Sequence, residues 1–221
     1  MPDTKFVVME KLGRTYGRGS RLVRAVDGVS ASIRGGDRIA IMGPSGSGKT
    51  TLLHLLGGID EPSEGGISWP ALGGRETLRP GRVAYVFQTS SLIEALTVVE
   101  NVELPLLLSG QSQGEARERA AAALAGAGLE SLAERLPEEL SGGQAQQVAI
   151  ARAIASGARL ILADEPTGQL DHPTAQRLLD RLLGALEGSD AALVLTTHDH
   201  LIASRMSRIW RIEHGRMEAT S

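Results

Sequence analysis

The sequence contains no cysteine among its 221 residues, which excludes disulfide bonds and thiolate metal sites and fits a reducing compartment. No apolar run approaches the roughly 20 residues that a helix needs to cross a bilayer. The first residues, Met1 to Lys11, mix charged and apolar side chains and lack the apolar core of a signal peptide. We therefore expect the chain alone to be soluble, so that any role at a membrane requires a partner.

The net charge of the chain is also small. Lys and Arg total 23 against 26 Asp and Glu, a net charge of −3. Such a chain has no long-range attraction for nucleic acid or anionic lipid, so no direct nucleic-acid partner is expected. The length suits one α/β domain, with room for a smaller subdomain.

One glycine-rich stretch carries a specific chemistry. It reads Gly43-Pro44-Ser45-Gly46-Ser47-Gly48-Lys49-Thr50, the pattern G-x-x-x-x-G-K-[ST], and we call it the phosphate loop. An apolar strand, 39–42, precedes it and a helix over 51–56 follows, so the loop's N–H groups and the helix dipole together favour an anion. Lys49 can reach the β- and γ-phosphates, and the Thr50 hydroxyl can bind Mg²⁺. The chain is predicted to bind a nucleoside triphosphate.

The remaining pattern predicts alternating strands and helices around a helical block. The predicted strands are 6–9, 26–33, 67–69, 83–87, 160–163 and 193–196, with a terminal hairpin at 208–212 and 216–219. The stretch 70–81 is expected to be loop. Helix is expected from 98 to 136 with a break at 126–128, over 142–155, and after Pro173. These elements favour a mostly parallel sheet with an inserted helical block.

Two acidic residues follow a buried-type strand. The strand Leu160-Ile161-Leu162-Ala163 delivers Asp164 to the magnesium side of the phosphate loop. Glu165 comes next and is placed to polarise the water that attacks the γ-phosphate. Solvated acids at a strand end are common by themselves, but an upstream phosphate loop favours the catalytic interpretation.

A second anion-seeking helix start follows at Ser141-Gly142-Gly143-Gln144, which we call the signature motif. It could be an ordinary helix cap, since Ser141 is a good capping residue. A single triphosphate does not need two phosphate-binding helix ends in one chain. We therefore expect this one to serve the nucleotide held by another subunit.

In this order the motifs resemble the nucleotide-binding subunit of ABC (ATP-binding cassette) transporters over essentially the whole chain. The resemblance depends on the phosphate loop, Gln88 after an aromatic strand end, the signature motif, Asp164-Glu165, Leu170-Asp171 and His198. It implies a single cassette, 1–221, with the α/β core of P-loop NTPases, a small antiparallel β subdomain and an α-helical subdomain at about 90–156. It also implies ATP and Mg²⁺ as ligands.

The resemblance assigns further roles. Tyr16 would stack on the adenine, Gln88 would sense Mg²⁺ and the attacking water, and His198 would contact the γ-phosphate. Asp171 would lie at the seam of a dimer. The nucleotide-binding set so implied is Tyr16, Gly43, Pro44, Ser45, Gly46, Ser47, Gly48, Lys49, Thr50, Thr51, Ser141, Gly142, Gly143, Gln144 and Asp171. The catalytic set is Glu165, His198, Lys49 and Gln88, and the metal set is Thr50, Gln88 and Asp164.

Within the family the chain is similar to the lipoprotein-releasing and macrolide-exporting ATPases, through the stretches 57–60, 97–106 and 165–171. That similarity implies a second ATP-binding subunit, expected to be an identical copy, and an integral membrane permease, at the cytoplasmic face of the membrane. The apolar stretch 98–108 is expected to pack in the helical block and to form the rim of a groove for the permease, with Pro105 ending its helix. The chain departs from the family at Gln147, at Gln169 and in the short segment 70–82.

Other classes share parts of this pattern. An ATPase that regulates a non-transporting membrane partner, in cell division or wall hydrolysis, would have the same residues, and this alternative stays open. A chromosome or repair ATPase would need long coiled coils between Gln88 and Ser141, and the interval is too short. A simple kinase has no use for the signature motif.

Overall fold

Two β-sheets contain all the strands of the computed structural model, which describes residues 4–89, 91–168 and 170–218. The larger sheet has six strands in the order β5-β6-β7-β3-β8-β9, and only the β8–β9 pair is antiparallel. Its strands are β3 (Arg38–Met42), β5 (Val83–Val86), β6 (Leu160–Ala163), β7 (Ala192–Thr197), β8 (Arg208–Glu213) and β9 (Arg216–Glu218). The predicted mostly parallel sheet is confirmed, as is the terminal hairpin up to residue 218; Ala219 lies outside the described residues.

The smaller sheet is antiparallel, in the order β2-β1-β4. Its strands are β1 (Lys5–Tyr16), β2 (Val23–Arg34) and β4 (Glu64–Ser68), with a short 3₁₀ helix η1 (Gly19–Arg21) between the first two. β1 and β2 are longer than predicted because bulges let their pairing continue through irregular register. β4 begins at Glu64, earlier than expected, because Gly65 lets the chain approach β1 closely. Gly65 has φ of 70°, and a Cβ there would lie 2.1 Å from the Lys11 carbonyl oxygen.

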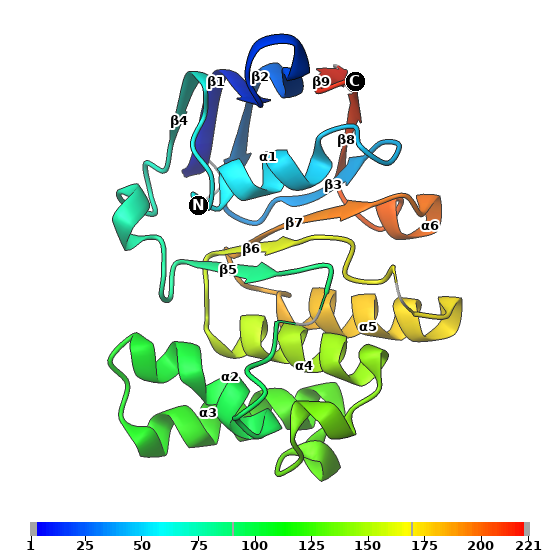
Figure 1. Ribbon diagram of the computed structural model, residues 1–221. Coiled ribbons are helices and arrows are strands. Elements are labelled where there is room, and N and C mark those ends of the chain that lie inside the picture. Colours follow the sequence, from blue (N-terminus) through cyan, green and yellow to red (C-terminus); the bar gives the residue numbers. More distant parts are fainter. Residues whose placement is uncertain (1–3, 90, 169, 219–221) are drawn as a thin grey trace.

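Helix α1 (Lys49–Leu56) lies between the two sheets, and α4 and α5 cover the opposite face of the larger sheet (Figure 1). A first hydrophobic core lies between the two sheets around α1, and it includes Phe6, Ile41, Leu52 and Leu162. The second core lies under α4 (Gly142–Ala155), α5 (His172–Ala185) and α6 (His200–Ala203). A leucine stripe on α5 contributes Leu178, Leu179 and Leu182 to it, and Leu186, just after the helix, joins them.

A third core belongs to the helical block alone. It forms between α2 (Val98–Leu108), α3 (Gln113–Ala127) and one face of α4, with η3 (Glu130–Leu132) beside it, and η4 (Pro137–Glu139) leads into α4. The prediction that Pro105 ends its helix is wrong: α2 continues to Leu108, because the fully buried Leu106 anchors the last turn. The break predicted at 126–128 is also misplaced, since α3 runs through Gly126 and ends before Gly128, which has φ of 68°.

The stretch 70–81 is more ordered than a plain loop. It contains the 3₁₀ helix η2 (Arg75–Thr77), and both Leu72 and Leu78 are fully buried in the first core. These leucines anchor the connection between β4 and β5, which the Gly- and Pro-rich composition does not indicate. In the part of the chain that the structure describes, no helix has the length and apolar character required to traverse a bilayer.

Candidate functional site

The phosphate loop is held by close backbone contacts. Gly48 is the N-cap of α1 with φ of 104°, and a Cβ there would lie 1.9 Å from the Ala25 carbonyl oxygen. A Cβ on Gly43 would lie 2.1 Å from the carbonyl oxygen of Ile212. Only glycine fits at these two positions, so β2 and β8 fix the shape of the loop. The first N–H groups of α1 have no partners inside the helix and face the site.

Lys49 directs its ammonium back into the loop. Its Nζ donates to the carbonyl oxygens of Gly43 at 2.9 Å and Pro44 at 3.0 Å, and its side chain is largely buried. The nearest carboxylate oxygen is Glu165 Oε1, at 3.9 Å. Residues from two different strand ends therefore meet at one buried cation.

A cleft of about 490 Å³ surrounds this point. Three residues far away in the sequence, Gln88, Glu165 and His198, lie on it together with Thr51. The phosphate loop contributes Gly43, Pro44, Ser45, Gly46, Gly48, Lys49 and Thr50. Ser47 is the exception: its hydroxyl is buried and has no hydrogen-bond partner in the described part of the chain.

The two acids after β6 have different surroundings. Asp164 is 4% exposed and its Oδ1 accepts a hydrogen bond from the Thr196 hydroxyl at 2.6 Å. Glu165 turns outward with φ of 42°, a strained conformation for a side chain of this size, and its N–H donates to the same Thr196 oxygen at 2.8 Å. The Glu165 carboxylate lies 3.5 Å from His198 Nδ1. The strained turn aims Glu165 into the cleft while Asp164 stays buried.

The donors predicted for a metal are the Thr50 hydroxyl, the Gln88 amide and the Asp164 carboxylate. These are the hard oxygen ligands that Mg²⁺ prefers when substrate phosphates and water complete its shell. No group of three or more His, Cys, Asp or Glu within metal-binding distance occurs among the described residues. The residues present fit a magnesium ion that arrives with a nucleotide.

The signature motif does not lie on the cleft. Ser141 caps α4: its Oγ accepts the Gln144 N–H at 3.2 Å, and its own N–H donates to Gln144 Oε1 at 2.9 Å. Neither Ser141, Gly142, Gly143 nor Gln144 lines the cleft. One chain therefore has two separate anion-seeking helix ends.

Asp171 occupies the equivalent position at the start of α5. Its Oδ1 accepts the Thr174 N–H at 3.0 Å, and that hydrogen bond holds the pKa of Asp171 below its usual value. It lies outside the cleft. Gln169, two residues before it, lies outside the described residues.

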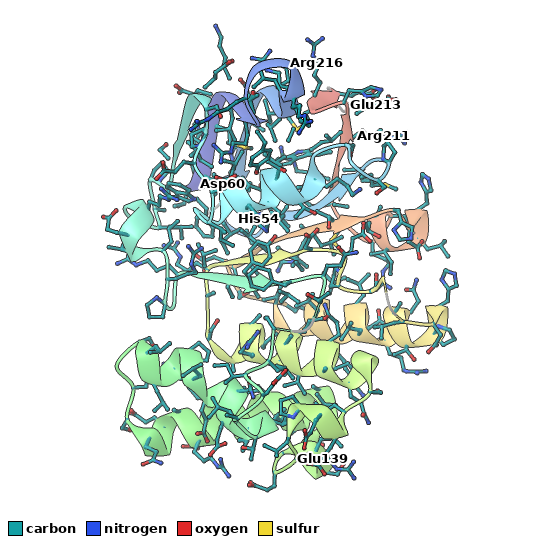
Figure 2. The ribbon with its side chains drawn as sticks, viewed as in Figure 1. His54, Asp60, Glu139, Arg211, Glu213 and Arg216 are labelled. Atoms are coloured by element: carbon teal, nitrogen blue, oxygen red, sulfur yellow. The ribbon has the colours of Figure 1, made fainter. Side chains whose placement is uncertain are left out.

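Tyr16 also lies beyond the residues that line the cleft. Its hydroxyl donates to Asp60 Oδ2 at 2.6 Å, and the Arg14 guanidinium carbon lies 4.6 Å from the ring centroid. Arg14 also pairs with Asp60 at 2.8 Å. Asp60 lies beyond the C-terminal end of α1, beside the small sheet (Figure 2). The ring is thus fixed through its hydroxyl and one of its faces.

Sequence reasoning missed the residues that support these groups. Thr196 orients both acids, and Gln146 and Arg152 of α4 donate to backbone oxygens on either side of Gln88. Asn101 of α2 is fully buried and bonds the backbone of Ile93 in both directions. Their partners lie 8 to 61 residues away in the sequence. A buried polar residue within an apolar helix face is the one signal that could have indicated them.

A second hollow of about 500 Å³ is mainly apolar and is lined by residues of β5, α2 and α4. The residues around it include Ile59, Arg79, Phe87, Leu104, Leu108 and Arg152. We call it the apolar groove. The opposite face of α2 packs into the third core through Val98, Val102 and Leu106, which confirms the packing expected for this stretch.

Comparisons with known proteins agree with this geometry. A family model described as "ABC transporter" matches residues 26–168. The lipoprotein-releasing system ATP-binding protein LolD of Legionella pneumophila (strain Lens) is 42% identical over 95% of this chain and 96% of its own length. The macrolide export ATP-binding/permease protein MacB of Hyphomonas neptunium is 40% identical over 97% of this chain but only 34% of its own length. The solved dimeric post-hydrolysis structure of the ATP-binding cassette MJ0796, bound to ADP and Pi, matches with a TM-score of 0.88 and 39% identity over 96% of this chain and 97% of that one.

Proposed function

Because this chain belongs to the ABC transporter family, as its ATP-hydrolysing cassette, we propose that two copies enclose two ATP molecules between them. Each ATP lies between Lys49 of one copy and Ser141 of the other, in a two-fold symmetric dimer. The observation that carries the proposal is the separation of the two helix ends: the phosphate-loop cleft holds Glu165, His198 and Gln88 but not the signature motif. A second copy supplies what the cleft lacks.

Each side chain on the cleft has a task in hydrolysis. The Glu165 carboxylate accepts a proton from the attacking water, whose oxygen bonds to the γ-phosphorus while the bond to the β,γ-bridging oxygen breaks. The products are ADP and inorganic phosphate. Lys49 and His198 hold the γ-phosphate oxygens as negative charge redistributes, and Gln88 orients the water. When bound, Mg²⁺ neutralises phosphate charge, and Thr50, Gln88 and Asp164 would hold it.

Residues outside the cleft complete the nucleotide site. Tyr16 stacks on the adenine with the ring face opposite Arg14, so recognition uses an aromatic surface without base-specific hydrogen bonds. In the closed dimer Ser141, Gly142, Gly143 and Gln144 direct the first turn of α4 at the partner's γ-phosphate. Asp171 lies at the seam between the copies. The amides of Gly46 and Ser47 belong to the anion nest of the phosphate loop.

The partner is an integral membrane permease that inserts a short apolar helix into the apolar groove. Leu108 is 66% exposed and Phe87 is 37% exposed at this groove, a cost that a docked helix removes. The names of the relatives, a lipoprotein-releasing protein and a macrolide exporter, favour a permease that transmits force across the membrane, with this chain at the cytoplasmic face. Residues 90–156 act as a helical subdomain of the single cassette 1–221, supported by the third core. The alternative, an ATPase that regulates a non-transporting membrane partner, would use the same groove.

Trapping the dimer tests the proposal. The variant Glu165→Gln binds ATP but does not activate water, so ATP should convert it from monomer to a stable dimer in size-exclusion chromatography. Glu187→Gln, an exposed glutamate just after α5, is the matched control and should turn over normally. Normal ATP hydrolysis by Glu165→Gln contradicts its role as base, and an ATP-loaded variant that stays monomeric contradicts the shared sites.

A further inference from the structure

Two side chains of helix α4 hold the backbone on either side of Gln88. Gln146 Nε2 donates to the Phe87 carbonyl oxygen at 3.2 Å. Six residues further along α4, Arg152 Nη1 donates to the Ser91 carbonyl oxygen at 2.9 Å and Nη2 donates to the Ser91 hydroxyl at 2.7 Å. We call these contacts the α4 clasp. Gln88 itself is exposed on the cleft between the two attachment points.

The α4 clasp withdraws polar groups from water, which costs free energy. Gln146 is 4% exposed, so its amide needs the Phe87 carbonyl to be satisfied. Partial burial lowers the pKa of the Arg152 guanidinium, and the Ser91 oxygens that accept its hydrogen bonds are neutral; no carboxylate pairs with it in the described part of the chain. Arg152 is half-buried, and a cation partly withdrawn from water without a counter-ion stabilises a fold less than an apolar residue would. A methionine could fill the same space, so packing alone does not account for an arginine here.

On its other side the chain before Gln88 belongs to the large sheet. Val86 ends β5, and its carbonyl oxygen accepts the Asp164 N–H at 2.8 Å. Gln88 therefore lies between strand β5, whose end bonds the backbone of the proposed metal-binding acid Asp164, and helix α4, which begins at the signature motif. A displacement of α4 relative to the sheet must move Phe87 and Ser91, and Gln88 with them.

We propose that Gln146 and Arg152 are positioning residues that make Gln88 follow helix α4. This inference rests on the proposed function, in which the first turn of α4 contacts the ATP of the partner copy. When the partner's ATP binds the first turn of α4 and displaces this helix, the α4 clasp displaces Gln88 in the cleft of the chain to which α4 belongs. The occupancy of one site thereby sets the water-orienting group of the other, through hydrogen bonds within a single chain.

A double-mutant cycle on the full chain tests the clasp. Arg152→Met keeps the bulk of the side chain and removes its donors, and should lower the turnover rate at saturating ATP about tenfold, within the range of measured couplings. Gln88→Ala should lower it comparably, and the combined variant should be no slower than Gln88→Ala alone. Arg119→Met is the matched control: Arg119 donates to the Ala155 carbonyl at 2.8 Å within the same helical block but does not contact the chain around Gln88. In a double variant, the fold-losses in turnover rate caused by Arg119→Met and Gln88→Ala should multiply.

The ATP dependence of turnover gives a second readout. The wild type should show a sigmoidal dependence on ATP, and Arg152→Met a hyperbolic one, because its two sites no longer communicate. Gln146→Leu removes the other half of the clasp and should behave in the same way; it decides the matter if Arg152→Met does not fold, as judged by thermal unfolding. Three outcomes would overturn the proposal. The rate losses of the Arg152 and Gln88 variants could multiply in the combined variant, Gln88→Ala could leave the turnover rate unchanged, or the wild type could show a hyperbolic dependence on ATP.

The same variants separate this inference from the function on which it rests. In a Glu165→Gln background, Arg152→Met should still form the ATP-trapped dimer, since Lys49 and Ser141 are intact. Loss of the trapped dimer in Glu165→Gln alone contradicts the shared sites. If the trapped dimer forms but the turnover losses of Arg152→Met and Gln88→Ala multiply, only the α4 clasp is contradicted.

Discussion

The hydroxyl of Thr196 donates to Asp164 Oδ1 across 2.6 Å, joining the ends of two neighbouring parallel strands. The same oxygen accepts the N–H of Glu165. Thr196 is fully buried, and its single hydroxyl satisfies both the buried Asp164 carboxylate and the Glu165 N–H. The positions of the proposed base, Glu165, and of the proposed metal-binding acid, Asp164, thus depend on one hydroxyl.

Replacing that hydroxyl should affect stability and metal use together. Thr196→Val keeps the shape but leaves the Asp164 carboxylate and the Glu165 N–H without a partner, at a cost of about 1–3 kcal/mol in unfolding free energy. Urea unfolding measures this cost, and the Mg²⁺ concentration for half-maximal turnover should rise. Thr197→Val is the control, because the Thr197 hydroxyl accepts only the Asp199 N–H, at 3.0 Å, in the described structure. Equal Mg²⁺ dependence in the two variants would contradict the role of Thr196.

Asp60 should make stability depend on pH. Burial raises its pKa, but hydrogen bonds from the Tyr16 hydroxyl and the Glu61 N–H, with the charge of Arg14, outweigh this and hold the pKa below its usual value. A depressed acid stabilises the fold above its unfolded pKa, near about pH 4, and loses this contribution as the pH falls through its folded pKa.

The wild type should therefore exceed Asp60→Asn in unfolding free energy at neutral pH, and the difference should shrink in acid. Tyr16→Phe removes one donor and should raise the Asp60 pKa, which NMR titration of the carboxyl carbon can measure. A difference between wild type and Asp60→Asn that is constant from neutral to acid pH would show that the depressed carboxyl contributes nothing.

Mixing two inactive variants tests the shared sites directly. Lys49→Ala removes the phosphate-binding ammonium, and Ser141→Arg blocks the signature motif. Each alone should be inactive, whereas a mixed dimer contains one site that combines the intact Lys49 and the intact Ser141. Random pairing makes half of the dimers mixed, so turnover should recover to at most about a quarter of the wild-type rate. Two different Lys49 variants mixed together should recover nothing, and full activity of Ser141→Arg alone would refute the arrangement.

The apolar groove can be tested by a charge on its rim. Leu108→Glu places a carboxylate where the permease helix is proposed to dock and should abolish co-purification of the membrane partner from mild detergent. Because Leu108 is 66% exposed, the melting temperature of the isolated chain should barely change. Leu22→Glu, at a side chain 60% exposed near the β1–β2 hairpin, is the control and should retain the partner. Retention by both variants would place the docking surface elsewhere.

Local patterns predicted most of the fold. Strands such as 39–42 and 160–163 are short apolar runs next to Gly-rich or acidic turns, and the phosphate loop has a fixed spacing. Both strands occur with the expected bounds, β3 beginning one residue earlier. The sequence misled where packing overrides propensity: Pro105 sits inside a helix because Leu106 is buried beyond it.

The supporting residues of the site could not be predicted in this way. Thr196 meets Asp164 from 32 residues away, and Arg152 meets Ser91 from 61 residues away. Such pairs depend on how β6, β7 and α4 are placed in three dimensions, which leaves no periodic trace along the chain. The roles that the family resemblance assigns to Tyr16 and Asp171 stay predictions, because neither residue lies on the cleft of a single chain.

The close backbone contacts at Gly43 and Gly48 have a kinetic consequence. With the carbonyl groups of Ile212 and Ala25 pressed against it, the phosphate loop is already shaped before any triphosphate arrives. Little chain entropy remains to be lost on capture, so loading should be fast. In the proposed arrangement two loaded chains must still meet, and the rate of that encounter rises with the local density of subunits.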